Sequence, residues 1–350
     1  MPVLPPSLLR WTAADFAQVD QEGVYADPTT GARLLPGAPE GVLVGERTSL
    51  PVEFMEAIAS WQATAPTGTE LEIALRVEIE GRWTRWWTMA YWSSEQTRRR
   101  SLENQDDEDG VVATDTLVLR RPARALQWRV VLRGDTTGRS PLLRGLAVMA
   151  TPAGMRPRND RPHAVSPLPV PEISQMEIAT YGHLWCSPAA LTMVLQYWYR
   201  RTRDPQLEPF LAPDATERLT VPGVYDPVYD GTGNWPFNTA FAASLGLEAY
   251  VVRFASLAEV ARWVAAAVPV IVSIAWEGGD LDDAPCDRSS GHLTVVVGFT
   301  ADGDVIVNEP RADTRDGARV RRVYPRDQFR RAWFRRSGGV TYLIYPKGIV

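Results

Sequence analysis

Two cysteines and three histidines carry most of the nucleophilic and acid–base capacity of this 350-residue chain. Cys186 stands two residues before Pro188, where an uninterrupted run of helix-forming residues begins and extends to Tyr199. A thiol at the start of a helix meets the positive end of the helix dipole, which lowers its pKa below the usual ~8.5. Because the thiolate is the nucleophilic form, Cys186 is a candidate nucleophile, with a buried structural cysteine as the alternative.

His292, at the start of the apolar segment 292–299, is a candidate general base. The turn at 300–304 predicts a hairpin between this strand and the next, which ends at Asn308 and Glu309. Neighbouring antiparallel strands lie only ~5 Å apart, so a side chain at 308 or 309 should reach the imidazole and orient it. Because side chains alternate along a strand, only one of Asn308 and Glu309 can face His292, and the pattern leaves open which.

The remaining cysteine and histidines have plainer interpretations. His163 lies in a Pro-rich stretch and should be solvated, whereas His183 lies in the loop just before Cys186. Cys286 is expected to be a surface thiol, with a redox pairing to Cys186 as the alternative. Two cysteines are too few for a disulfide framework or for a zinc site built from four thiolates. We therefore expect free thiols, no metal and no cofactor.

The composition and charge are those of an ordinary globular protein. The 37 basic and 42 acidic side chains leave a formal charge of -5, which offers no general attraction to nucleic acid or anionic lipid. No stretch approaches the ~20 apolar residues that a membrane helix needs. The first residues lack a basic region followed by an apolar one, so no export signal is predicted and the compartment, cytoplasmic or exported, stays open.

The chain divides at a Pro-rich stretch, 152–171, which is typical of a semi-rigid linker. Before it, residues 1–151 contain segments that alternate apolar and polar side chains, most clearly from Glu70 to Glu80. Short alternating segments separated by turn signals predict an antiparallel β-sandwich, written here as a jelly-roll-like accessory domain. The other segments with this pattern are 83–93, 111–120 and 126–133.

Residues 172–350 combine helical and strand patterns and predict an α+β domain. A helix carrying Cys186 should pack on a mostly antiparallel sheet, and Asn238 is expected to cap a further helix over 239–245. The expected helices are 188–199 and 257–267, and the expected strands are 269–275, 292–299, 304–308 and 340–345. The basic run 319–336 is interpreted as a solvated face.

Four tryptophans of the N-terminal half, Trp83, Trp86, Trp87 and Trp92, allow two interpretations. Aromatic faces stack on sugar rings, which would give this half a contact with glycan or cell wall. Tryptophan is also bulky core material for a sandwich, and we favour that interpretation.

Three segments together resemble the C39-like family of the papain-like cysteine peptidase superfamily. These segments are Gln175–Leu195, Gly291–Pro310 and Tyr324–Pro346. The resemblance implies that Cys186 is the nucleophile and His292 the base. It further implies that Gln175 completes the oxyanion hole with the backbone N–H of Cys186, which requires the loop 178–185 to fold back. The family commonly has Asp before the proline, where this chain has Glu309.

Three functions are compatible with these residues. The leading one is a thiol-dependent hydrolase, a cysteine peptidase that cleaves peptide or amide bonds through Cys186, His292 and either Glu309 or Asn308. The second is an acyltransferase or amidase that uses the same site on a non-peptide substrate. The third is an inactive peptidase-like protein that binds glycan or cell wall through its sandwich.

Overall fold

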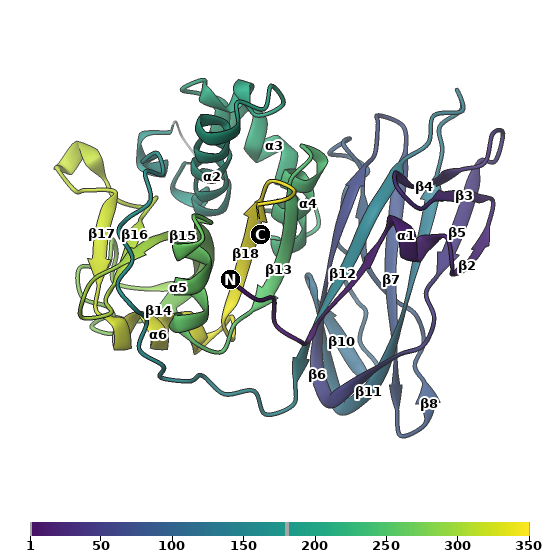
Figure 1. The fold of residues 1–350 in the computed structure, drawn as a ribbon, viewed down its shortest axis with the longest axis horizontal. Helices are drawn as coiled ribbons and strands as arrows, with labels where there is room; N and C mark the ends of the chain where they lie inside the picture. Colours follow the sequence, from purple (N-terminus) through teal and green to yellow (C-terminus); the bar gives the residue numbers. More distant parts are fainter. Residues whose placement is uncertain (1, 179–181, 350) are drawn as a thin grey trace. The chain divides into compact units, whose positions relative to one another are not determined.

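A computed structural model describes residues 2–178 and 182–349, which form two units (Figure 1). The first unit comprises Pro6–Met155 together with a later segment, Tyr225–Ser244. The second unit comprises the rest of the described chain. The segment 225–244 is therefore separated from its own unit in sequence by 69 residues of the other (156–224).

The first unit is built on strands that all pair antiparallel, which confirms the predicted all-β character of this half. Its strands are β1 (Leu8–Thr12), β2 (Asp20–Glu22), β3 (Val24–Asp27), β4 (Gly31–Leu34), β5 (Glu40–Val44), β6 (Thr48–Thr64), β7 (Glu70–Ile79), β8 (Arg82–Trp83), β9 (Trp87–Trp92), β10 (Gly110–Ala113), β11 (Thr116–Arg133) and β12 (Leu142–Pro152). Two helices, α1 (Ala13–Phe16) and α4 (Trp235–Ser244), accompany them.

Two long strands, β6 and β11, join these strands into one hydrogen-bonded network. The N-terminal part of β11 pairs with β10 and β6, and its C-terminal part pairs with β5 and β7. Such a change of partners needs a strand that bends, and the pairing of β11 with β6 contains two register shifts. The predicted strand 111–120 is therefore two strands, because the chain turns at Thr114, whose φ is 58°.

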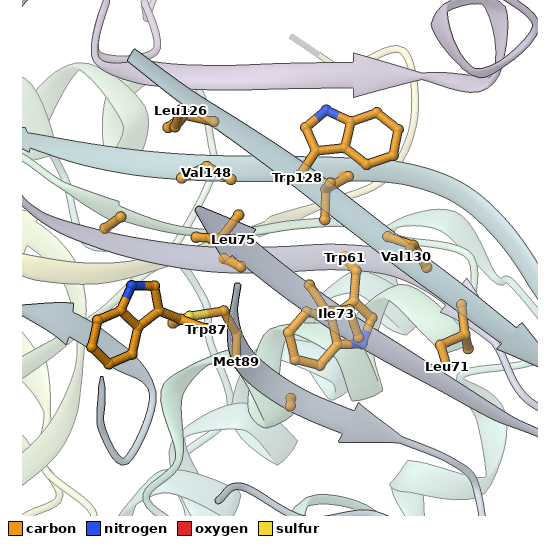
Figure 2. Packing of buried hydrophobic residues seen from close by; sticks show 14 of the residues in the cluster. Trp61, Leu71, Ile73, Leu75, Trp87, Met89, Leu126, Trp128, Val130 and Val148 are labelled. Atoms are coloured by element: carbon orange, nitrogen blue, oxygen red, sulfur yellow. The ribbon is translucent and has the colours of Figure 1, made fainter. Parts of the chain in front are cut away.

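The core lies between two layers of this sheet (Figure 2). Trp61 of β6 and Trp92 of β9 are not on paired strands, yet their rings meet edge to face at 5.9 Å. Such contact across unpaired strands requires the sheet to fold over and enclose its apolar side chains. Trp87 and Trp92 are both buried here, so they serve as core material rather than as a surface for sugars.

The segment 225–244 completes this core from outside the N-terminal half. Phe237 of α4 is fully buried, with its ring 6.2 Å from that of Trp61 and 5.6 Å from that of Trp92. The carboxylate of Asp115 accepts a hydrogen bond of 2.9 Å from the backbone N–H of Trp235, at the start of α4. Helix α4 begins before the predicted helix because Asn234 caps it, with its Oδ1 accepting from Phe237 N; the predicted cap, Asn238, is buried inside the helix.

The Phe237→Ala variant should lose about 3–5 kcal/mol of the free energy of unfolding of this unit, because the deletion leaves a cavity between two tryptophans. Urea unfolding followed by tryptophan fluorescence measures this loss. Phe241→Ala, on the same helix but only partly buried, is the matched control and should lose clearly less. A loss for Phe237→Ala no larger than that for Phe241→Ala would contradict the central role of Phe237 in this core.

The second unit contains six antiparallel strands in the order β13-β18-β14-β15-β16-β17, in agreement with the predicted α+β class. The strands are β13 (Glu248–Arg253), β14 (Val270–Trp276), β15 (Ser289–Phe299), β16 (Val305–Asn308), β17 (Arg321–Tyr324) and β18 (Val340–Tyr345). The helices are α2 (Cys186–Thr202), α3 (Val221–Val224), α5 (Leu257–Ala265) and α6 (Arg326–Arg335), with short 3-10 helices at Gln175–Glu177, Gly182–Leu184, Glu208–Leu211 and Thr314–Asp316 and a short π-helix at Thr216–Thr220.

Helix α2 packs on this sheet and is anchored at both ends. Near its start, the Ser187 hydroxyl lies 3.2 Å from the hydroxyl of Tyr342 on β18, and near its end Trp198 donates to the carbonyl of Ile344 at 2.8 Å.

No helix of the described residues is long and apolar enough to cross a bilayer.

The basic run 319–336 is a solvated face on its arginine side only, and the prediction missed its buried apolar residues. It forms β17 and α6, and α6 buries Phe329 and Trp333 while its arginines stay at least partly exposed. The prediction was based on the arginines and overlooked the apolar residues that recur between them at helical spacing.

The end of the Pro-rich stretch is held against β15. Val165 forms a bridge with Phe299, and the N–H of Leu168 donates to the carbonyl of Val297 at 2.8 Å. Gly298 permits this approach, because a Cβ there would lie 2.8 Å from the carbonyl oxygen of Val165. The chain that leads to Gln175 is thereby attached to the sheet that carries His292.

Candidate active site

Cys186 is the first residue of α2, and the residue as a whole is partly exposed. Trp185 precedes it as the N-cap, and the first backbone bond of the helix runs from Ala189 to Trp185. The amide groups of a first helical turn have no partner within the helix and point toward its N-terminus. The sulfur therefore lies where backbone N–H groups and the helix dipole favour negative charge.

His292 lies near the start of β15 and is almost completely buried. Its Nε2 is 2.5 Å from Oε1 of Glu309, which leaves Nδ1 as the ring nitrogen available to Cys186. The ring meets the indole of Trp276 edge to face, with centroids 5.5 Å apart. The imidazole is thus held on one side by a carboxylate and on another by an aromatic wall.

Glu309 follows directly after β16 and is fully buried. Besides His292, its Oε1 accepts from the backbone N–H of Arg311 at 2.9 Å, and its Oε2 accepts from the hydroxyl of Tyr324 at 3.3 Å. A buried carboxylate is costly unless donors surround it. Three donors on two oxygens meet this requirement and fix the direction of the carboxylate.

These contacts set the protonation states of the site. Burial opposes ionisation of the Cys186 thiol, but the hydrogen bond and positive charge of His292, with the N–H of Leu293, outweigh it and lower the pKa of Cys186. Burial likewise disfavours the charged imidazole, but Glu309 and Cys186 outweigh it and raise the pKa of His292 to about 10. Burial alone would raise the pKa of Glu309, but the charge and hydrogen bond of His292 and the backbone N–H of Arg311 have the larger effect. The pKa of Glu309 is therefore lowered. The favoured state is a thiolate, an imidazolium and a carboxylate.

The structure does not bring the side chain of Asn308 to His292. Its Nδ2 donates to the carbonyls of Val170 and Pro171 at 3.1 and 3.0 Å, and its Oδ1 accepts from Nε of Arg321 at 3.0 Å. Strand register explains the difference, since Asn308 pairs with Val295 and alternation turns its side chain away from the imidazole. Asn308 instead holds the end of the Pro-rich stretch.

Gln175 is fully buried in the 3-10 turn Gln175–Glu177. Its Nε2 donates to the carbonyl of Gly182 at 2.9 Å, and the same carbonyl accepts from Trp185 N at 2.9 Å. The Gln175 amide therefore lies beside the chain that enters α2. The expected return of the loop 178–185 is partly outside the described residues, because it includes 179–181.

The side chains of the other candidates take no part in these hydrogen bonds. Cys286 donates to the carbonyl of Arg288 at 3.3 Å, and both cysteines are free thiols. His163 and His183 are exposed. Two contacts of Glu309 were missed in the sequence, those of Arg311 and Tyr324. Arg311 lies only two residues beyond Glu309, whereas no sequence signal connects Tyr324 to it.

Trp83 and Trp86 of the first unit are only partly buried and lie in a different setting. The guanidinium of Arg76 lies 4.9 Å from the ring centroid of Trp83 and 4.6 Å from that of Trp86, and Arg129 lies 5.1 Å from Trp86. A guanidinium therefore already covers aromatic face that a sugar ring would need for stacking.

A thiol, an imidazole and a carboxylate connected in this order form the kind of constellation used for nucleophilic catalysis. Comparison with known families agrees with this class. Residues 167–340 match the Peptidase C39-like family, and residues 8–151 match the Peptidase C39 N-terminal domain. The C-terminal half of the chain belongs to the C39-like peptidase family.

Similar solved structures are distant. A Bacillus anthracis protein assigned as a C39-like peptidase is 17% identical, with 52% of this chain and 99% of that chain covered and a TM-score of 0.34. The xylan-binding module CBM15 is 13% identical, with 44% and 100% covered and a TM-score of 0.24. At these scores the similarities define no shared ligand. No curated protein matches the chain.

Proposed function

We propose that this protein is a cysteine peptidase, a thiol-dependent hydrolase of peptide or amide bonds. The observation that carries the proposal is the buried His292–Glu309 pair beside the Cys186 thiol at the start of a helix. A purely structural cysteine needs no imidazolium partner, and the burial of an ion pair is costly in itself. Membership of residues 167–340 in the C39-like family supports the same conclusion.

In the first half of the reaction, the Cys186 thiolate attacks the carbonyl carbon of the substrate. The imidazolium of His292 gives its Nδ1 proton to the leaving amine as the carbon–nitrogen bond breaks. An acyl-thioester on Cys186 and a neutral His292 remain. Glu309 holds the ring so that Nδ1 faces the sulfur, and its charge stabilises the imidazolium.

In the second half, His292 accepts a proton from water while the water oxygen attacks the thioester. Collapse of the tetrahedral intermediate breaks the carbon–sulfur bond and releases the carboxylic acid. Cys186 leaves as thiolate, and His292 is again an imidazolium. The starting ion pair is restored without any outside acid or base.

The oxyanion of each tetrahedral intermediate needs hydrogen-bond donors. We assign this role to the backbone N–H of Cys186 and to Gln175. One hydrogen of the Gln175 Nε2 is used by the Gly182 carbonyl, and an amide nitrogen carries two. All proposed site residues belong to the second unit, so we assign the sandwich an accessory role.

The proposal predicts a bell-shaped pH dependence. The reactive ion pair forms as the pH rises through the lowered pKa of Cys186, and it is lost as the pH rises through the pKa of His292, about 10. Iodoacetamide should therefore alkylate Cys186 readily below about pH 7, where ordinary thiols are mostly protonated. Mass spectrometry of the two cysteine-containing peptides measures the rates, with Cys286 as the internal reference.

Release of free amine from a peptide library tests the reaction itself and should follow the same pH dependence. Equal alkylation rates for both cysteines at every pH would contradict the assignment of Cys186. Turnover of small amides or of acyl acceptors, with no peptide cleaved, would favour the amidase or acyltransferase alternative.

A further inference from the structure

Tyr324 lies at the end of β17, in a position that does not by itself lead to the active site. In the pairing of β16 with β17 it stands opposite Val305, four residues before Glu309. Its hydroxyl nevertheless donates to Oε2 of Glu309 at 3.3 Å. The side chain must therefore extend toward the C-terminal end of β16, where the carboxylate lies.

The packing around Tyr324 holds its ring in this direction. Tyr324 is fully buried and stacks on Phe329 of α6, with ring centroids 5.9 Å apart and planes at 21°. Phe329 is itself fully buried, and its backbone N–H bonds to the carbonyl of Pro325 in the first turn of α6. Helix α6 thus supports a phenol whose polar end meets the catalytic carboxylate.

The chemistry of Glu309 explains why such support is needed. A glutamate has one more rotatable bond than an aspartate, so its carboxylate can take more orientations and loses more entropy when it is fixed. The contacts divide between its oxygens: Oε1 accepts from His292 and Arg311, and Oε2 accepts from Tyr324. Without the hydrogen bond from Tyr324, only Oε1 would be held, and the carboxylate could turn more freely about the last bond of the side chain.

We propose that Tyr324 is a positioning residue, which acts through Glu309 to keep His292 aligned with Cys186. The inference rests on the proposed function, since it assigns roles to the same three reacting groups. Tyr324 touches none of the reacting atoms, and its effect passes through one carboxylate oxygen.

The surroundings of Tyr324 keep it a donor. Burial and the negative charge of Glu309 raise the pKa of Tyr324 well above its ordinary value, against the opposing positive charge of Arg322. Arg322, on the same strand, also donates to the carbonyls of Asp283 and Arg319, at 2.5 and 3.0 Å. The hydroxyl therefore stays protonated, with its hydrogen available to Glu309.

The test is Tyr324→Phe, which removes the hydroxyl and keeps the stacked ring. We expect kcat to fall about five- to twentyfold with KM little changed, because a hydrogen bond to a charged group is lost at one remove from the chemistry. The pH midpoint of Cys186 alkylation should rise, and the alkaline limb of activity should move to lower pH, since a looser carboxylate stabilises the ion pair less.

The matched control is Tyr197→Phe, which removes another buried hydroxyl, bonded at 2.8 Å to the carbonyl of Ala267. This change should leave both limbs in place. In a Glu309→Gln background, Tyr324→Phe should have little further effect on kcat, because two residues that act as a unit are not additive.

Unchanged pH limbs in Tyr324→Phe, or full additivity with Glu309→Gln, would overturn the positioning role. The alkylation midpoint needs no peptide substrate, so this outcome can be told apart from failure of the proposed function. If the unmodified protein itself shows no selective alkylation of Cys186 at low pH, the proposed function fails. If it does and Tyr324→Phe leaves the midpoint unchanged, only the present inference fails.

Discussion

Replacement of Cys186 by alanine is expected to lower peptide hydrolysis by about 10⁴-fold or more, because no other group of the site can form the acyl intermediate. Alanine is a good helix former, so α2 should begin as before and the fold should be retained. Steady-state kinetics with the best substrate of the peptide library measures the loss. Circular dichroism and the urea midpoint establish that the variant is folded.

The matched control is Cys286→Ala. Its sulfur bonds only to the carbonyl of Arg288 among the described contacts, and it takes no part in the His292–Glu309 pair. We expect full activity from this variant. If Cys186→Ala kept its activity and Cys286→Ala lost it, Cys286 would be the nucleophile and the proposed mechanism would be refuted.

The Glu309→Gln variant should lower kcat/KM by about 10²- to 10⁴-fold, as expected when the orienting carboxylate of a triad loses its charge. Glutamine has the same shape, and its Oε1 can still accept from His292 and Arg311. The loss is therefore one of charge and of the acceptor for the Tyr324 hydroxyl, rather than of packing. The pKa of His292 should fall from about 10, so the alkaline limb of activity should move to lower pH.

Asn308→Ala distinguishes the two neighbouring candidates. It removes the donor to Val170 and Pro171 and the acceptor of Arg321, so it should cost about 1–3 kcal/mol of stability through groups left without partners. The pH limbs of the folded variant should stay where they are. If Asn308→Ala moved the limbs and Glu309→Gln did not, Asn308 would be the orienting residue instead.

Much of the second unit was predictable because its local patterns agree with its final structure. The helix at 188–199 and the strands at 269–275, 292–299 and 340–345 all occur within a few residues of their expected bounds. Apolar periodicity and a proline in the first helical turn report directly on local backbone structure. The helix 239–245 was placed too late in the chain, because Asn234 rather than Asn238 caps it.

Contacts between distant residues were less accessible. The sequence predicts a sandwich over 1–151, but α4 supplies Phe237 to the same core from more than 80 residues further along the chain. No periodicity within 225–244 indicates which sheet its apolar side chains will meet. The basic run 319–336 was likewise interpreted from its charge, whereas its buried aromatic residues decide where α6 lies.

The sequence by itself determined the chemical character of this protein: one thiol at a helix start, one histidine on an apolar strand and a polar step after the next strand. These features are local, and helix dipoles, strand alternation and turn residues act over a few positions. Only the tertiary structure decided that Glu309 rather than Asn308 meets His292. The register of β16 against β15 turns Asn308 away from the imidazole, and the carbonyl of Val170 accepts a hydrogen bond from its side chain. The contact of Tyr324 with Glu309 depends on the packing of α6, which no short segment of sequence contains.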